Sequence, residues 1–470
     1  MYPYLTTTPT ARLVALVAIL GAAPASAQLS LRDALRDADR AAYGNRIAAG
    51  TSAAAHAAAR APLKGILPSV RIEAGYLRTT DPIGVFGSSL RQRTVTQANF
   101  DPQRLNYPSP IGNYQGGLVL EQPLVNADAW TGRRAAVSAA DATRATEEWT
   151  RLSTHVDVVR AYYGAVLASE RTATLQAAAR AAHSHVAQTE AMVRQGLATK
   201  SDALLAGVRA GDVDAQLAEA EGAATVARRQ LAVLLGRAGT DSFPDLVAPA
   251  RLPSSARINA AVVGDTAILP SHPRADLRAA TGAVEAAHAD AVRARSTLLP
   301  RVNGFARVDW NSASRLYAGD RNWTVGVMAS WNLLPGPGEL ADIQATAGRV
   351  AAARAQAEAA RANARLEDEQ TRIALIVALT RLDIAERGTA QSAEAHRMIS
   401  RKYEAGLATV VELLDAQAAE TQCALGLSQA RWAAIVADAE RQRALGLDPA
   451  TLADLDDAAT AAGRETRSGR

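Results

Sequence analysis

The four residues Gly-Leu-Ala-Thr occur twice in this chain, at 196–199 and at 406–409. Each copy lies between two long alanine-rich stretches that contain no proline. The same offset of 210 residues also superimposes residues 118–124 on residues 328–334. A register that holds over about 120 residues predicts a duplicated structural unit. Each unit is predicted to contain a strand, a long helix, a tight turn and a second long helix.

The composition restricts the class of partner. The 470 residues include 51 basic and 47 acidic side chains, and only 4% are aromatic. Charges of both signs that are interspersed in this way indicate solvated helix surfaces, and they give no case for a nucleic-acid partner. The single cysteine excludes a disulfide framework.

The N-terminus has the parts of a secretory signal. Arg12 supplies a positive charge, residues 13–20 an apolar core and residues 25–27 a small-residue cleavage site. We therefore expect residues 1–27 to be a signal peptide and the mature chain to be exported. The longest later apolar run, at 373–379, is too short to cross a bilayer as a helix. If the mature chain crosses a membrane, it must therefore do so as β-strands.

Four stretches alternate between apolar and polar side chains, which is the period of a β-strand. They extend over residues 70–76, 117–124, 302–310 and 323–333. The apolar face of the last stretch is predicted to face lipid, and its residues are Trp323, Val325, Val327, Ala329 and Trp331. Outer-membrane barrel strands have this length and period, although the strands of a soluble β-sandwich alternate equally well.

The strands are expected to pair as two hairpins, at about 68–124 and 300–334. The connection within the first hairpin, at about 77–115, is rich in Gly, Pro, Asn and Gln and is much longer than that within the second. Long loops on one side of a barrel are normally the extracellular ones.

Around these hairpins the chain divides into segments. Residues 28–236 are expected to form the first repeat and residues 272–447 the second, each with a helix, a β-hairpin and a long helical hairpin. Residues 237–271, rich in Pro and Gly, form a connector, and residues 448–470 a partly disordered tail.

Four strands per chain predict an oligomer. An open sheet in lipid would leave backbone groups at its edges without hydrogen-bond partners. Known membrane barrels begin at about eight strands. Several copies must therefore share one barrel, and three copies would supply about twelve strands.

The order of these elements resembles that of the TolC-type outer membrane efflux proteins. The resemblance covers about 29–447 and includes the hairpin end Gln122-Pro123-Leu124 and both Gly-Leu-Ala-Thr turns. It implies an α+β membrane protein, a homotrimer with a 12-stranded transmembrane β-barrel in outer-membrane lipid and long antiparallel helices that form a periplasmic α-barrel. It also implies passive export of small toxic solutes or polypeptide in a tripartite efflux or type I secretion system. A periplasmic adaptor and an inner-membrane pump are the implied partners.

The resemblance places a periplasmic aperture at the helix turns. The implied aperture residues are Ser201, Asp202, Tyr403, Glu412 and Asp415. The alternatives are that Asp202 caps or solvates a helix start and that the two later acids are ordinary exposed helix charges. An arginine that the family carries two residues past the second glycine is Ala408 here, so the inter-helix lock made by that arginine is not expected.

The turns themselves have the pattern of a tight connection between two helices. Gly196 and Gly406 are expected to end a helix in the left-handed conformation, each followed by an anchoring leucine, Leu197 or Leu407. In the family, this tip docks the hairpins of the adaptor.

No arrangement of residues predicts an enzyme, a cofactor or a metal. His183 and His185 are the one close histidine pair, but residues two apart lie on different faces of a helix, so we expect a solvated surface. The alternative function is a soluble periplasmic coiled-coil adaptor or scaffold. It would explain the signal and the helices but not two hairpins with apolar outer faces.

Overall fold

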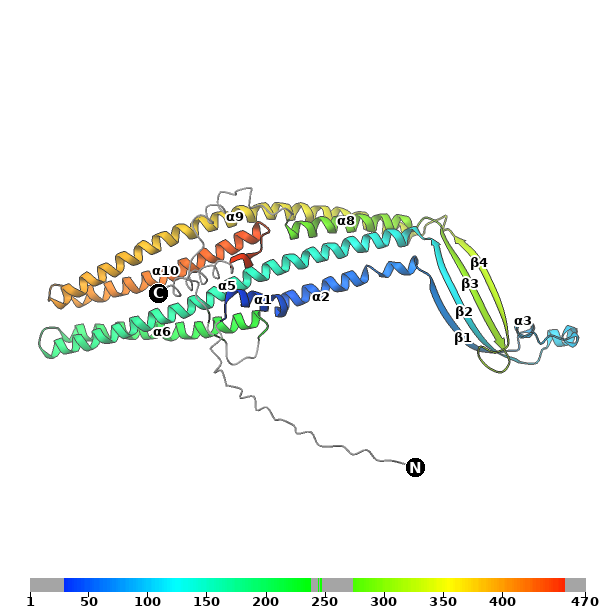
Figure 1. Cartoon of the computed structure of the whole chain (residues 1–470), viewed down its shortest axis with the longest axis horizontal. Helices are drawn as coiled ribbons and strands as arrows, with labels where there is room; N and C mark the ends of the chain where they lie inside the picture. The colour runs from blue at the N-terminus through cyan, green and yellow to red at the C-terminus, as the bar shows by residue number, and fades with distance from the viewer. Residues whose placement is uncertain (1–28, 238–243, 245, 247–273, 453–470) are drawn as a thin grey trace, which may run out of the picture.

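The computed structural model describes residues 29–237, 244, 246 and 274–452. The predicted signal peptide, almost all of the predicted connector and the tail beyond residue 452 lie outside the described residues. The described chain is elongated, with long helices over most of its length and a four-stranded sheet at one end (Figure 1).

The helices repeat with the register of the sequence. Helix α5 (Ala127–Arg194) and helix α9 (Pro337–Glu404) have 68 residues each, and they begin 210 positions apart. Helix α6 (Lys200–Leu234) and helix α10 (Val410–Ala444) have 35 residues each at the same offset. At 1.5 Å per residue the longer pair extends for about 100 Å. The predicted helix–turn–helix unit is therefore present twice.

Lateral packing stabilises these long helices, since local propensity alone cannot. Helix α5 packs along α6 and α8 (Ala275–Ser296), and α9 packs along α10 and α8. Most of the buried apolar residues of α9 and α6 are alanines, whose small side chains let neighbouring helices approach closely.

The helix expected at the start of the first repeat is divided in the structure. The structure has α1 (Leu31–Ala41), α2 (Tyr43–Ala58) and a 3₁₀ turn, η1 (Ala61–Gly65). The break falls at Ala42, whose ψ of 130° is not helical, and the Asn45 side chain donates a hydrogen bond to the carbonyl of Ala38 across it.

The largest apolar cluster lies near the middle of the rod, where α1 meets α5, α6 and α10 (Figure 1). Leu31 and Leu35 of α1 contribute to it, with Val159 and Tyr162 of α5. The Tyr162 hydroxyl donates to the carbonyl of Leu29 over 2.7 Å, so the polar atom of the largest fully buried side chain has a partner. A short turn after α10, η4 (Pro449–Leu452), packs on α5 and α10.

The sheet contains β1 (Ser69–Thr79), β2 (Ile111–Val125), β3 (Arg301–Ser312) and β4 (Asp320–Ser330), in that order, and every pair is antiparallel. The β2–β3 pairing joins the two predicted hairpins into one sheet. Strands β1 and β4 form its edges.

The strand register collects the alternating residues onto common faces. Val70 pairs with Leu120, Leu120 with Ala306 and Ala306 with Val325, and directly paired residues point to the same side of a sheet. One face is therefore apolar across all four strands. On the other face, Arg307 forms an ion pair with Glu73 over 3.1 Å.

The connection within the first hairpin is shorter than expected, at 80–110, because both flanking strands are longer than the alternation predicts. It contains α3 (Pro82–Arg91), η2 (Gln97–Phe100) and α4 (Pro102–Asn106). These elements lie beyond the end of the sheet, away from the long helices (Figure 1).

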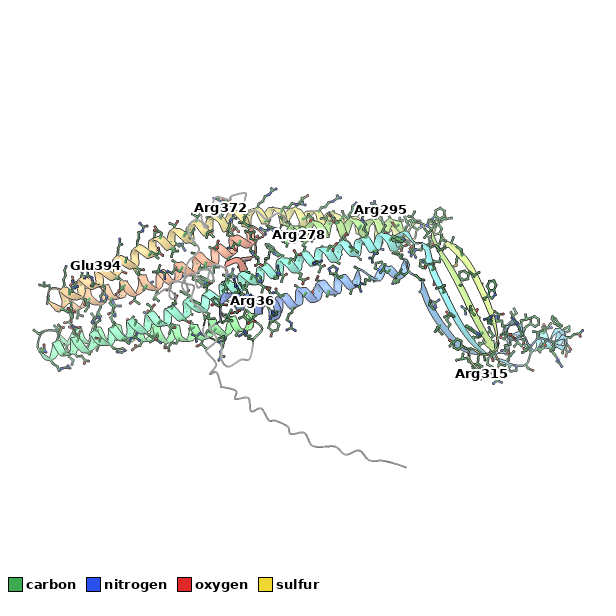
Figure 2. The ribbon with its side chains drawn as sticks, viewed as in Figure 1. Arg36, Arg278, Arg295, Arg315, Arg372 and Glu394 are labelled. Atoms are coloured by element: carbon green, nitrogen blue, oxygen red, sulfur yellow. The ribbon has the colours of Figure 1, made fainter. Side chains whose placement is uncertain are left out.

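Trp331 was predicted as a strand residue, and this is wrong, because β4 ends at Ser330. Ser330 pairs with Arg301, so the next partner of the ladder would be Pro300, which has no N–H to donate. The Trp331 indole instead donates to the carbonyl of Leu298 over 3.0 Å. In Figure 2, Arg295 near the end of α8 lies beside this end of the sheet, and Arg315 of the β3–β4 turn lies at the opposite end.

Candidate functional site

The two helix–helix turns end their first helices in the same way. Gly196 has a φ of +74° and Gly406 a φ of +73°, so both adopt the predicted left-handed conformation. The Leu197 amide donates to the carbonyl of Met192 and the Gly196 amide to that of Val193, over 2.9 and 3.0 Å. This is the Schellman pattern, and the second turn repeats it.

The leucines after the two glycines do not anchor the turns, so that expectation is wrong. The Leu197 side chain is 74% exposed and the Leu407 side chain 79% exposed. The Schellman hydrogen bonds close the turn without a packed side chain at this position. Each hairpin therefore ends in an apolar side chain that projects into solvent.

A capping box begins the second helix of each hairpin. Thr199 precedes α6 and its side chain accepts from the amide of Asp202, while the Asp202 carboxylate accepts from the amide of Thr199 over 2.9 Å. Thr409 and Glu412 repeat this arrangement at α10, with 2.7 Å from the Thr409 nitrogen to Glu412 Oε2. The alternative that Asp202 caps a helix start is therefore what the structure shows, and the Thr-x-x-Asp and Thr-x-x-Glu spacings are the sequence signal of both capping boxes.

Capping also fixes the charge of these two acids. The pKa of Asp202 is lowered, chiefly by the hydrogen bond from the Thr199 backbone, and the pKa of Glu412 is lowered in the same way by Thr409. Both carboxylates are therefore ionised at neutral pH. Asp415 lies exposed one turn further along α10.

Ser201 belongs to the first capping arrangement. Its hydroxyl lies 2.7 Å from Thr199 Oγ1, the atom that also donates to Asp202. Among the predicted aperture residues, the structure thus brings Ser201 and Asp202 together at the first turn.

Tyr403 is buried, whereas Glu412 and Asp415 are exposed. Its side chain is only 7% exposed and packs against Val410, Leu413 and Leu414 just inside the second turn. Its hydroxyl lies 3.2 Å from the Met192 sulfur of α5. Tyr403 therefore connects the second helical hairpin to the first. Ala408 packs against the same cluster.

His183 and His185 of α5 lie on different faces of the helix, as their spacing predicts, but only His183 lies on a solvated surface. His183 is exposed and lies 3.0 Å from Asp214 Oδ2 of α6. His185 is partly buried, and its ring nitrogen Nδ1 is inaccessible to solvent, so the expected surface position is wrong for this residue.

The predicted lipid-facing side chains of β4 are open to the surroundings. Trp323 is 74% exposed, Val325 66% and Val327 67%, and Ala329 is also exposed. In the described part of the chain, no helix is long and apolar enough to cross a membrane.

Comparison with known proteins gives a family. The family model of the outer membrane efflux proteins matches residues 25–237 and 272–447, which is most of the chain. No curated protein matches the chain. Neither the family match nor the folds described next support the soluble adaptor alternative.

Solved outer membrane channels share the fold. The Campylobacter jejuni CmeC outer membrane channel is similar with a TM-score of 0.71 and 15% identity, covering 88% of this chain and 85% of that one. The outer membrane protein VceC from Vibrio cholerae has a TM-score of 0.71 and 19% identity, covering 88% and 96%. The open state of the Neisseria gonorrhoeae MtrE outer membrane channel has a TM-score of 0.69 and 19% identity, covering 89% of each chain.

The duplicated helical hairpins, the sheet with one apolar face and the match of the family model over both repeats agree, and this chain belongs to the outer membrane efflux protein family.

Proposed function

We propose that three copies of this protein form one continuous passive duct that carries small toxic solutes or polypeptide out of the periplasm through the outer membrane. The observation that carries this proposal is the placement of a one-sided apolar sheet at one end of helices about 100 Å long, with exposed turns at the other end. The sheet crosses the membrane and the helices span the periplasm. No catalytic step is involved, and a partner pump supplies the energy.

The sheet edges support the sharing of one barrel. Strands β1 and β4 each have one neighbour in the protomer, so each presents one row of backbone groups without a strand partner in the described chain. Lipid cannot satisfy those groups. Pairing β4 of one copy with β1 of the next satisfies them, and three copies close a barrel of twelve strands.

An apolar stripe on α9 supports the same assembly along the helices. Leu366, Ile373, Val377 and Ile384 are each at least 43% exposed in the protomer. Their spacings of seven, four and seven residues are those of a coiled-coil seam. A neighbouring copy that packs on this seam buries it and closes the helices into a tube.

The exposed turns support docking to a periplasmic adaptor. Leu197 and Leu407 project from two turns of the same shape, so a trimer presents six such apolar side chains around one end of the tube. An adaptor whose own helical hairpins carry apolar side chains would bury them. The partner pump of the inner membrane reaches the duct through this adaptor.

The acidic residues support an aperture at the same end. Asp202 and Glu412 each use one carboxylate oxygen to accept the capping hydrogen bonds, and both remain ionised. Asp415 is a second acidic residue on α10. Three copies place these acids in rings, which favour cations and narrow the opening. Ser201 lies in this ring, and Tyr403 acts from inside the tip by holding the two hairpins of a protomer together.

Two measurements test the function. Reconstituted in planar bilayers, the detergent-purified protein is expected to conduct ions as a trimer. A water-soluble monomer without conductance contradicts the duct. For docking, a photo-crosslinking residue at Leu407 is expected to capture the adaptor in cells, and one at Leu340, near the sheet end of α9, is not. Equal capture from both positions contradicts docking at the turns.

A further inference from the structure

A cleft lies across α5, α8 and α9 near the end of the sheet that adjoins the long helices. Its volume is about 530 Å³, and residues from the first turns of α5 and the second half of α8 line it. Three charged side chains from three different helices meet at its walls. They are Arg134 of α5, Arg354 of α9 and Glu285 of α8. We call this cleft the outer cleft.

The side of the helices on which the outer cleft opens follows from a second cleft, which we call the inner cleft. Arg301 lines the inner cleft. Arg301 precedes Val302, and Val302 pairs with Ala329 of the predicted lipid-facing set. Successive strand residues point to opposite faces, so Arg301 belongs to the polar face of the sheet. The inner cleft therefore continues the polar face.

Spacing along α8 places the two clefts on opposite sides of that helix. Val284 and Val292 line the outer cleft, whereas Ala286 and Asp290 line the inner cleft. Each of the second pair is two positions from one of the first. Residues two apart on an α-helix point in directions roughly 200° apart. The outer cleft therefore continues the apolar face of the sheet.

The arginines of the inner cleft have acidic partners within the protomer. Arg301 lies 2.7 Å from Asp128 Oδ2, and Arg293 Nε lies 2.6 Å from Asp290 Oδ1. Both ion pairs lie in the wall of the inner cleft. These charges are therefore already neutralised by neighbouring helices and strands.

The charges of the outer cleft are different in this respect. Among the described residues, Arg134, Arg354 and Glu285 have no ion-pair or hydrogen-bond partner. Both arginines are exposed. The outer cleft therefore presents two positive charges and one negative charge to whatever occupies it, above an apolar wall that includes Val292.

An exposed tryptophan relates the outer cleft to the level of the membrane. Trp130 is 60% exposed and lies one turn closer to the sheet than Arg134, on the same face of α5. Tryptophan is enriched where the hydrocarbon meets the lipid headgroups. Helical side chains tilt toward the helix N-terminus, so the Arg134 and Arg354 side chains lean toward the sheet, where α5 and α9 begin.

We propose that the outer cleft binds the headgroup of a phospholipid that carries both a phosphate and a primary ammonium. The phosphate oxygens accept hydrogen bonds from the guanidinium groups of Arg134 and Arg354, which suit phosphate geometry. The ammonium donates to Glu285, so the ligand complements all three charges. This inference rests on the proposed function, because the sheet must lie in the outer membrane for the cleft to reach the headgroups of its periplasmic leaflet.

Native mass spectrometry of the detergent-purified full-length trimer tests the site. Phosphatidylethanolamine carries the phosphate and the ammonium, and phosphatidylglycerol carries the phosphate alone. One phosphatidylethanolamine per protomer is expected, with phosphatidylglycerol bound more weakly. Arg134→Gln and Arg354→Gln are each expected to weaken the binding of both lipids at least about tenfold. Glu285→Gln is expected to remove the preference for phosphatidylethanolamine and to keep the binding of phosphatidylglycerol.

The matched control is Arg349→Gln. Arg349 is a 62% exposed arginine of the same helix as Arg354, and its partner Asp290 lines the inner cleft. This variant is expected to bind both lipids as the unaltered trimer does. Circular dichroism and the trimer fraction on size exclusion establish that each variant is folded before lipid is added.

Several results overturn the proposal. They are no bound phosphatidylethanolamine in the unaltered trimer, unchanged affinity in Arg134→Gln or Arg354→Gln, and an equal loss in Arg349→Gln. Displacement of the lipid by an equal concentration of inorganic phosphate also contradicts it, because the cleft would then be a site for free anions. A trimer that conducts but retains no lipid contradicts this site alone, whereas a water-soluble monomer without conductance contradicts the duct.

Discussion

His155 Nδ1 lies 2.6 Å from Asp448 Oδ1, so a buried histidine of α5 holds the segment that follows α10. Its other nitrogen, Nε2, lies 2.8 Å from Asp39 Oδ1 of α1. Carboxylates accept hydrogen bonds, so both nitrogens donate and the ring is an imidazolium. Burial lowers the pKa of His155, but the hydrogen bonds and charges of Asp448 and Asp39 outweigh it, and the pKa is raised.

The contacts of His155 with Asp448 and Asp39 predict that the stability of the middle of the rod depends on pH. The raised pKa of His155 gives stability that is complete below the ordinary value of 6.5 and is lost as pH rises through the folded-state pKa. Burial raises the pKa of Asp448, but His155, Ala450 and Arg151 together lower it, so its contribution is present above 3.8 and is lost as pH falls through the lowered value. The contact therefore stabilises most between these two values.

His155→Gln is expected to remove this pH dependence. The variant should lose free energy of unfolding near the lower end of about 1.5–3 kcal/mol per charged hydrogen bond, because the carboxylates of Asp39 and Asp448 are both more than a third exposed. Melting temperatures at pH 5.5 and pH 8.5 check it, with His183→Gln as the control. If His155→Gln keeps the pH dependence of the unaltered protein, the His155 contacts are not its source.

The barrel face gives a second prediction. Val327 pairs with Gly304 on the apolar face, and Met328 pairs with Asn303 on the opposite face. In the proposed barrel, Val327→Arg should therefore cost about 2–4 kcal/mol near the middle of the bilayer, and Met328→Arg much less, because the face opposite the lipid would line the lumen. The yield of assembled trimer in outer membranes measures the difference. Equal losses would place the two residues on equivalent faces.

The duplication made the helices predictable, because one offset fixes both repeats. The duplication also extends beyond the two helix–helix turns. Gly236 follows α6 and Gly446 follows α10, with φ of +68° and +77°, and they too are 210 positions apart. The strands were less predictable at their ends. Alternation continues through Trp331, but pairing stops at Ser330 because the partner strand begins after Pro300.

The two helix–helix turns were predictable in their positions but not in their contacts. The burial of Tyr403 and of His185 Nδ1 depends on contacts that the folded chain brings together, which no local pattern encodes. The exposure of Leu407 depends on the turn closing through backbone hydrogen bonds alone. Asp202 was assigned by resemblance, whereas its capping spacing was readable from the sequence itself.

The second capping box gives a third prediction. Thr409→Ala removes the side chain that accepts from the Glu412 amide and donates to the Glu412 carboxylate. The first turn of α10 should then exchange its amide hydrogens faster, and the pKa of Glu412 should rise toward its ordinary value. Hydrogen exchange by mass spectrometry checks the first effect. Thr421→Ala, which removes a hydroxyl from the middle of α10, should leave that turn unchanged.

The acidic residues at the proposed aperture give a fourth prediction. Glu412→Gln together with Asp415→Asn removes six negative charges from a trimer while keeping the side-chain shapes. If these acids line the opening, the preference for cations in planar-bilayer recordings should fall. Glu394→Gln, on α9 and paired with Arg397, is the control and should leave it unchanged. Unchanged selectivity in the double variant would place the acids away from the pore.

The last prediction concerns the turn at Gly406. A Cβ there would meet no atom within 4 Å, so a side chain is opposed only by the φ of +73°. Left-handed backbone costs a residue other than glycine about 1–3 kcal/mol, and a β-branched residue is the least tolerant. Gly406→Val should therefore distort the turn while the sheet, about 100 Å away, still inserts and the trimer still forms.

The measurements for this variant are the trimer fraction, export in cells and crosslinking to the adaptor. A normal trimer that neither exports nor crosslinks is expected, and Gly196→Val should behave similarly because its φ is +74°. Gly388→Val is the matched control, since its Cβ also meets open space but its backbone is helical within α9. If Gly406→Val exported normally, the left-handed turn would not be the surface that meets the adaptor, and the exposed leucine beside it would need another partner.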